Sequence, residues 1–165
     1  MKVGILVTIV GAIAFAPGCG PAERSDTEDE FKNALLGAWR ITEVSVTSPD
    51  TTWTSKNLQP GLYIFSDRHF SNLLVSGTED RTPFTDETTD EEVLAAYQRF
   101  IADAGTYEVT DTELTTHNIV AKMPNFMNGG FTYRYTVHGD SLVLTFNAGW
   151  APAGGEITYR LVRLK

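Results

Sequence analysis

The chain of 165 residues is long enough for one domain with a sizeable core, and 13 Lys and Arg against 21 Asp and Glu give it a net charge of −8 at pH 7. An acidic surface repels phosphate backbones and anionic lipid headgroups, so the composition argues against a nucleic-acid partner and against a membrane-binding face on the domain. Cys19 is the only cysteine, so no disulfide can form within the chain.

Residues 1–18 are predicted to form a signal peptide of the lipoprotein type. Lys2 supplies a positive charge, and the apolar run Val3–Phe15 has the length of a signal-peptide core and is short for a membrane span. The small residues that lead into Cys19 resemble the bacterial lipobox, which implies acylation of Cys19, although Ala16 replaces the usual Leu. The protein is then exported to the cell envelope and anchored by lipid to the periplasmic or outer membrane. The alternative is cleavage with a free Cys19 and secretion.

A flexible acidic tether is predicted over residues 19–33, beginning at the acylated Cys19. Pro21–Asn33 contains one aromatic residue and has too little apolar surface to order itself. The folded domain is expected over residues 34–165.

Eight runs of residues have strand character, mostly with alternating apolar and polar side chains and turn signals between them. Gly139-Asp140 lies in one of these turns and gives the backbone freedom that a tight hairpin requires. Residues 51–60 are polar apart from Trp53 and Leu58, and are interpreted as a surface connection. The predicted strands are Leu35–Val46, Gly61–Phe65, His69–Val75, Thr106–Val109, Leu114–Ala121, Phe131–Val137, Leu142–Phe146 and Glu156–Leu164.

One helix is predicted over Asp90–Ala102. Thr89 and Glu92 have the spacing of a capping box, and Gly105 is expected to end the segment. Apolar residues recur at helical spacing, which predicts a stripe that packs against a larger body. This stripe comprises Val93, Tyr97, Phe100, Ile101 and Ala104.

Together these elements predict an all-β fold, an eight-stranded antiparallel up-and-down barrel with one helix between strands 3 and 4. Eight strands can close on themselves and leave room inside for one small ligand.

Two sets of residues carry a resemblance to known families. Leu36-Gly37-Ala38-Trp39-Arg40 looks like the Gly-x-Trp signature of lipocalins, and Arg163 is similar to the Arg that packs over that Trp. The ordered set Gly105-Thr106-Tyr107, Thr116-His117, Pro124-Asn125, Arg134 and His138–Leu144 resembles the bacterial lipocalin-like domain family. The resemblance spans Leu35–Leu164 and implies a calycin-type barrel with a small-molecule pocket, a structural role for Gly37, Trp39 and Arg163, and no particular reaction.

The ligand-binding candidates are mainly tyrosines, whose rings offer apolar contact and whose hydroxyls orient a ligand. They are Tyr63, Tyr107, Tyr133, Tyr135 and Tyr159. Ordinary core packing is the alternative for each.

His117 and Arg134 are the other two candidates. The alternation leaves open which face of its strand His117 occupies. The apolar neighbours of Arg134 place the Arg134 side chain outward. If the strand had the opposite orientation, Arg134 would point into the cavity and could bind an anionic group of a ligand. The three histidines lack the spacing of metal ligands, so no metal site is predicted.

The sequence therefore predicts a monomeric barrel that binds a small, largely apolar molecule, needs no cofactor, and meets the membrane only through its N-terminal lipid. Two alternatives stay open. One is an isomerase or hydrolase that uses His117 with a tyrosine of the same cavity. The other is an interaction lipoprotein with a solid barrel and a partner-binding loop at Lys122–Gly130.

Overall fold

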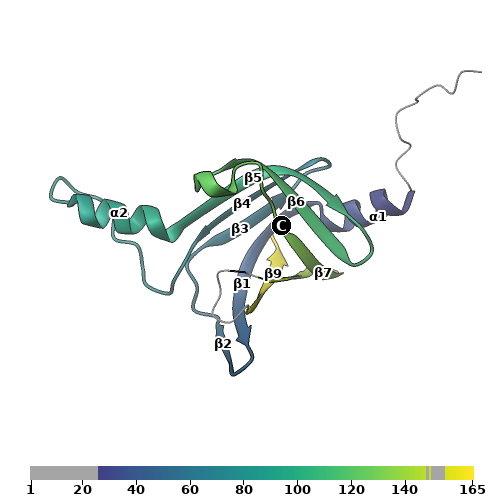
Figure 1. Cartoon of the computed structure of the whole chain (residues 1–165), viewed down its shortest axis with the longest axis horizontal. Helices are drawn as coiled ribbons and strands as arrows, with labels where there is room; N and C mark the ends of the chain where they lie inside the picture. Colours follow the sequence, from purple (N-terminus) through teal and green to yellow (C-terminus); the bar gives the residue numbers. More distant parts are fainter. Residues whose placement is uncertain (1–25, 148, 150–154) are drawn as a thin grey trace, which may run out of the picture.

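The computed structural model describes residues 26–147, 149 and 155–165, so the predicted signal peptide and Cys19 lie outside the described residues. Within these ranges the chain forms one antiparallel sheet, with one α-helix before its first strand in sequence and a second between its fourth and fifth strands (Figure 1). The elements are α1 (Asp26–Leu35), β1 (Gly37–Ser48), β2 (Thr51–Ser55), β3 (Gly61–Phe65), β4 (His69–Val75), α2 (Asp90–Arg99), β5 (Phe100–Val109), β6 (Glu113–Ala121), the 3-10 helix η1 (Pro124–Phe126), β7 (Thr132–His138), β8 (Ser141–Asn147) and β9 (Glu156–Arg163).

The predicted eight-stranded antiparallel barrel is confirmed. Strands β3 to β9 pair in sequence order, and β1 pairs with both β3 and β9, which closes the barrel. The helix α2 lies between the third and fourth barrel strands, β4 and β5. The short strand β2 is additional and pairs with β1 alone.

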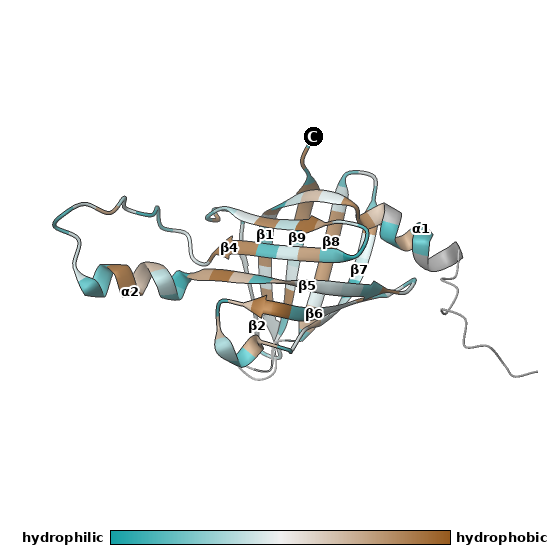
Figure 2. Cartoon of the chain, turned by 90° about the horizontal axis from the view of Figure 1, so that it is seen from above, coloured by the Kyte–Doolittle hydropathy of each residue, from teal (hydrophilic) through white to brown (hydrophobic). Residues whose placement is uncertain are grey.

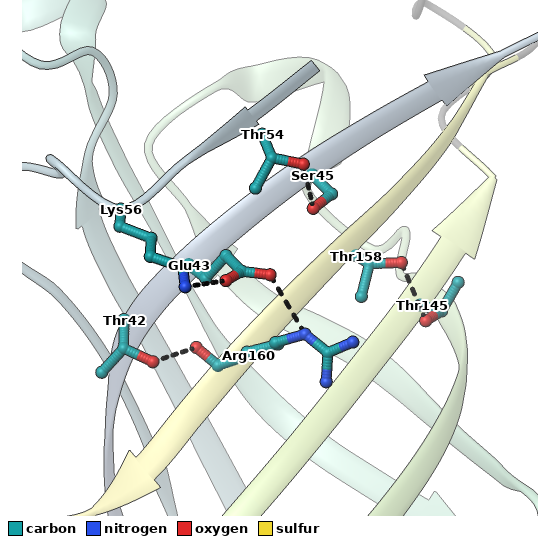
Figure 3. A network of polar contacts seen from close by, with 8 residues as sticks. All are labelled: Thr42, Glu43, Ser45, Thr54, Lys56, Thr145, Thr158 and Arg160. Carbon is teal, nitrogen blue, oxygen red and sulfur yellow. Dashed lines mark hydrogen bonds and ion pairs between the residues drawn. The ribbon is translucent and has the colours of Figure 1, made fainter. Parts of the chain in front are cut away.

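Polar contacts on the outer surface link β9 to its neighbours β1 and β8, where the barrel closes (Figure 3). Glu43 on β1 accepts a hydrogen bond from Arg160 on β9 at 3.1 Å and lies 3.4 Å from Lys56. The hydroxyls of Thr145 and Thr158 bridge β8 and β9 at 3.1 Å. These side chains point away from the interior, which leaves the inward positions of the same strands to apolar residues.

Helix α2 is shorter than the sequence predicts. Its capping box forms as expected, with Thr89 Oγ1 accepting from the Glu92 backbone N–H. The predicted end at Ala102 is wrong, because Phe100 already belongs to β5 and pairs with Val75 of β4. Hydrogen bonding along the β4–β5 ladder outweighs the helical spacing of the apolar residues in this stretch.

The predicted apolar stripe of α2 does not pack on the barrel. Phe100, Ile101 and Ala104 lie in β5, and no residue of α2 is buried. Val93 and Tyr97 are 43% and 52% exposed. Figure 2 shows α2 projecting from the barrel at the end opposite α1.

Helix α1 replaces the predicted tether over residues 26–33. Its last turns are held by burial, because Lys32 and Leu35 are enclosed and Leu35 belongs to the barrel core. The ammonium of Lys32 lies 5.7 Å from the ring centre of Tyr107. The acidic composition did not indicate a helix here because the contacts that order it come from the distant strand β5.

The end of the barrel beside α1 is closed by Trp39 and Arg163. The Arg163 guanidinium lies 4.0 Å from the Trp39 ring centre and donates hydrogen bonds to the carbonyls of Leu36 and Ala34. The Trp39 indole N–H donates to the Leu35 carbonyl at 2.7 Å. Strands β1 and β9 and the end of α1 therefore meet in one packed cluster.

Candidate ligand cavity

The barrel interior is hollow toward the end opposite α1. A main cavity of about 470 Å³ and a side cavity of about 310 Å³ adjoin each other, and Leu74, Ile101 and Tyr159 line both. Each volume falls within the range of roughly 300–1,000 Å³ that is typical of small-molecule pockets. The cavities lie where β3 and β5 begin and β4 ends, so they face the open end of the barrel.

Aromatic rings form much of the wall of the main cavity. Tyr133 and Phe146 meet edge to face with ring centres 5.1 Å apart, and Phe146 lies 5.7 Å from Tyr159. Tyr63 contacts Tyr159 at 6.2 Å, and Phe131 contacts Phe146 at 5.6 Å. Such a wall offers a large apolar surface with a few hydroxyl groups.

Two buried polar side chains that the sequence pattern did not single out also line the main cavity. They are Asn72 on β4 and Asp103 on β5, which are only 6% and 8% exposed. Tyr63 pairs with Asn72 across β3–β4, and Asn72 pairs with Asp103 across β4–β5. We call these three residues and Tyr133 the polar cluster, because all four line the main cavity and carry polar groups.

Burial controls the ionisation of this cluster. It raises the pKa of the Asp103 carboxyl, because the charged form loses hydration inside the barrel. It also raises the pKa of the Tyr63 and Tyr133 hydroxyls well above 10, and that of Tyr159 to about 12. The tyrosines are therefore neutral near pH 7 and present hydroxyl groups to the cavity.

The side cavity is mostly aliphatic. Strands β1 and β9 contribute Ile41, Val44, Val46 and Ile157, and Trp53 of β2 reaches the same space. This cavity extends the apolar surface away from Asp103.

Among the predicted tyrosines, Tyr63, Tyr133 and Tyr159 line the main cavity. Tyr107 and Tyr135 also point inward, but they lie toward the closed end of their strands. There the Tyr107 hydroxyl donates to the Ser66 carbonyl and the Tyr135 hydroxyl to the Thr110 carbonyl, each at 2.8 Å. These two residues tie strands to neighbouring turns and are not part of either cavity wall.

The structure places His117 and Arg134 on the outer surface. The His117 side chain is 54% exposed, and its Nε2 lies 4.0 Å from Glu108 Oε1. Arg134 forms an ion pair with Glu156. The barrel wall separates both side chains from the cavity tyrosines, so Arg134 faces outward as its apolar neighbours predict, and His117 does not share the cavity with a tyrosine.

The open end is bordered by α2 and the segment around η1. Gln98, Met123 and Phe126 line the main cavity there. The ammonium of Lys122 donates to the Tyr97 carbonyl and lies 4.0 Å from the Tyr97 ring centre, which connects α2 to the end of β6.

Comparisons with known proteins found a matching family model and similar solved structures. The family model described as "Lipocalin-like domain" matches residues 36–160. The chain is similar to a lipocalin-like protein from Bacteroides uniformis, with 14% identity, a TM-score of 0.43, and coverage of 79% of this chain and 99% of that chain. An uncharacterized protein from Bacteroides eggerthii gives 11% identity, the same TM-score and the same coverage. A search of curated proteins found no match.

Proposed function

Because the chain belongs to the lipocalin-like domain family, a fold of ligand-binding type, we propose that it binds a small, largely apolar molecule inside the barrel. The main cavity carries this proposal, since it combines an aromatic wall with a few converging polar groups at the open end of the barrel. The adjoining side cavity leaves room for an apolar extension of the ligand.

The proposal includes export and a lipid anchor at Cys19, with the domain acting as a monomer. The signal-like residues 1–18 and the position of Cys19 support the export and the lipid anchor. No helix in the described ranges is long and apolar enough to cross a membrane.

The geometry favours binding over the two alternatives. An enzyme that used His117 with a cavity tyrosine would need both side chains on one side of the wall, and they lie on opposite sides. An interaction protein with a solid barrel is disfavoured by the two cavities.

A cavity-filling variant tests the proposal. Leu74→Trp places an indole between the two cavities, whereas Leu73→Trp places one at the neighbouring outward position of β4. We expect the neutral probe N-phenyl-1-naphthylamine to gain fluorescence with the wild-type protein and with Leu73→Trp. For Leu74→Trp we expect an affinity at least about tenfold weaker, because the added ring occupies the binding volume.

Circular dichroism and thermal unfolding of both variants control for loss of the fold. If Leu74→Trp stays folded and binds the probe as tightly as Leu73→Trp, binding takes place outside the barrel and the proposal is wrong.

A further inference from the structure

The polar cluster contains a carboxyl group without a cationic partner. Asp103 has no ion pair or hydrogen bond through its side chain to any residue that the structure describes, although it is only 8% exposed. Buried carboxylates are ordinarily paired with a cation or hydrogen-bonded, because an isolated buried charge is costly.

Asn72, beside Asp103, provides a buried oxygen that also lacks a hydrogen-bond donor. Its Oδ1 is buried and accepts no hydrogen bond within the described residues. Buried side-chain oxygens without a partner are rare in folded proteins, so each one points to a missing donor. Asn72 and Asp103 pair across adjacent strands, so a single donor-rich group can reach both.

The one cationic side chain among the described residues that line the main cavity is engaged elsewhere. Lys122 lines the main cavity, but its ammonium donates to the Tyr97 carbonyl and lies over the Tyr97 ring at the open end. The interior is therefore acidic and rich in hydrogen-bond acceptors, within a chain whose net charge is −8. A ligand with a free carboxylate would be repelled by Asp103.

The aromatic rings around the cluster also favour a cation. Tyr63, Tyr133 and Tyr159 surround the cavity beside Asp103, and ring faces attract an ammonium group through their quadrupoles. A neutral alcohol would satisfy Asn72 but would leave the Asp103 charge uncompensated.

We propose that the barrel selects lipophilic amines, with the ammonium group against Asp103 and Asn72 and the apolar part toward Leu74, Ile101 and the side cavity. This inference rests on the proposed function, because it names the ligand class of the same cavity. The ammonium donates hydrogen bonds to both oxygens and compensates the buried charge.

Three probes of equal chain length test the selectivity: decylamine, 1-decanol and decanoate, measured by isothermal titration calorimetry at pH 7. We expect decylamine to bind at least about tenfold more tightly than 1-decanol, and decanoate to bind more weakly than both. Asp103→Asn should weaken decylamine binding at least about tenfold and leave 1-decanol binding within about threefold of wild type.

A matched variant controls for attraction to the acidic surface. Glu108→Gln removes one negative charge from the outer face of the same strand, where the side chain is 78% exposed. We expect it to leave decylamine affinity unchanged. Thermal unfolding of both variants verifies the fold, and competition among the three probes on the wild-type protein gives the ranking without any variant.

The outcomes separate the inference from the proposed function. If decanoate binds as tightly as decylamine, or if a folded Asp103→Asn protein keeps wild-type amine affinity, the amine inference is overturned while barrel binding stands. If the three probes and N-phenyl-1-naphthylamine all fail to bind the wild-type protein, both the inference and the proposed function fall.

Discussion

Asp103 illustrates how one residue can favour a ligand at the expense of stability. Its raised pKa means that the folded protein holds the carboxyl proton more strongly than the unfolded chain does. The contribution of Asp103 to the free energy of unfolding therefore falls as the pH rises through the ordinary carboxyl range to the raised folded pKa, and stays low above it. The other titratable groups at the cavity are three neutral tyrosines and Lys122 at the open end.

Asp103→Asn should therefore stabilise the ligand-free protein at neutral pH. We expect its advantage in free energy of unfolding over wild type to grow between pH 3 and pH 7, because only the wild-type side chain ionises over that interval. Urea unfolding at several pH values measures the difference. An advantage that stays constant with pH, or a loss of stability at pH 7, would show that ionised Asp103 does not oppose folding.

Arg163 lies at the closed end of the barrel, opposite the cavity that contains Asp103, and its contacts stabilise the fold. Arg163→Ala removes the contact with the Trp39 ring and the hydrogen bonds to two carbonyls, so we expect a loss of about 2–4 kcal/mol in the free energy of unfolding. Arg160→Ala on the same strand breaks an exposed ion pair with Glu43 and should cost under about 1 kcal/mol. Equal losses in urea unfolding would refute this role for Arg163.

The sequence predicted the orientation of a side chain correctly where apolar and polar residues alternate clearly along the strand. Tyr133 and Arg134 face inward and outward as the apolar pattern of β7 indicates. The face of His117 could not be read, because a bulge lies opposite Ala104 and Gly105 and leaves both Ile119 and Val120 exposed after it. Asn72 and Asp103 were missed because a polar residue at an inward position looks like an irregularity in the pattern.

At the level of elements, the strands were predictable and the segments between them were less so. Phe100–Ala104 fits both a helical and an extended period, and only the β4 ladder decides between them. Strand β2 lacks an apolar face, because Thr51, Thr52, Trp53 and Thr54 are all exposed, so the alternation carried no signal.

Helix α2 should behave as a local unit of stability. It contains no buried residue, so its formation adds little to the barrel core. We expect Thr89→Ala, which breaks the capping box, to speed amide hydrogen exchange in α2 about fivefold. The same variant should change the global free energy of unfolding by less than about 0.5 kcal/mol. A loss of more than about 2 kcal/mol would mean that α2 unfolds together with the barrel.

At the scale of the whole molecule, one end of the barrel is built for packing and the other for access. Trp39, Arg163 and α1 close the first end, while the cavities reach the second, near α2 and η1. The sequence predicted closure through Gly37, Trp39 and Arg163 from their family pattern. It could not predict a cavity volume, which depends on how side chains from different strands meet.

Native mass spectrometry on the protein purified from its own cells, before and after denaturing extraction, tests the central claim most directly. The binding account predicts an additional mass of a small, largely apolar molecule that disappears on extraction, with a fragmentation pattern that identifies its class. A bare polypeptide mass in every preparation, with no shift on adding hydrophobic probes, would contradict the claim that this barrel holds a ligand.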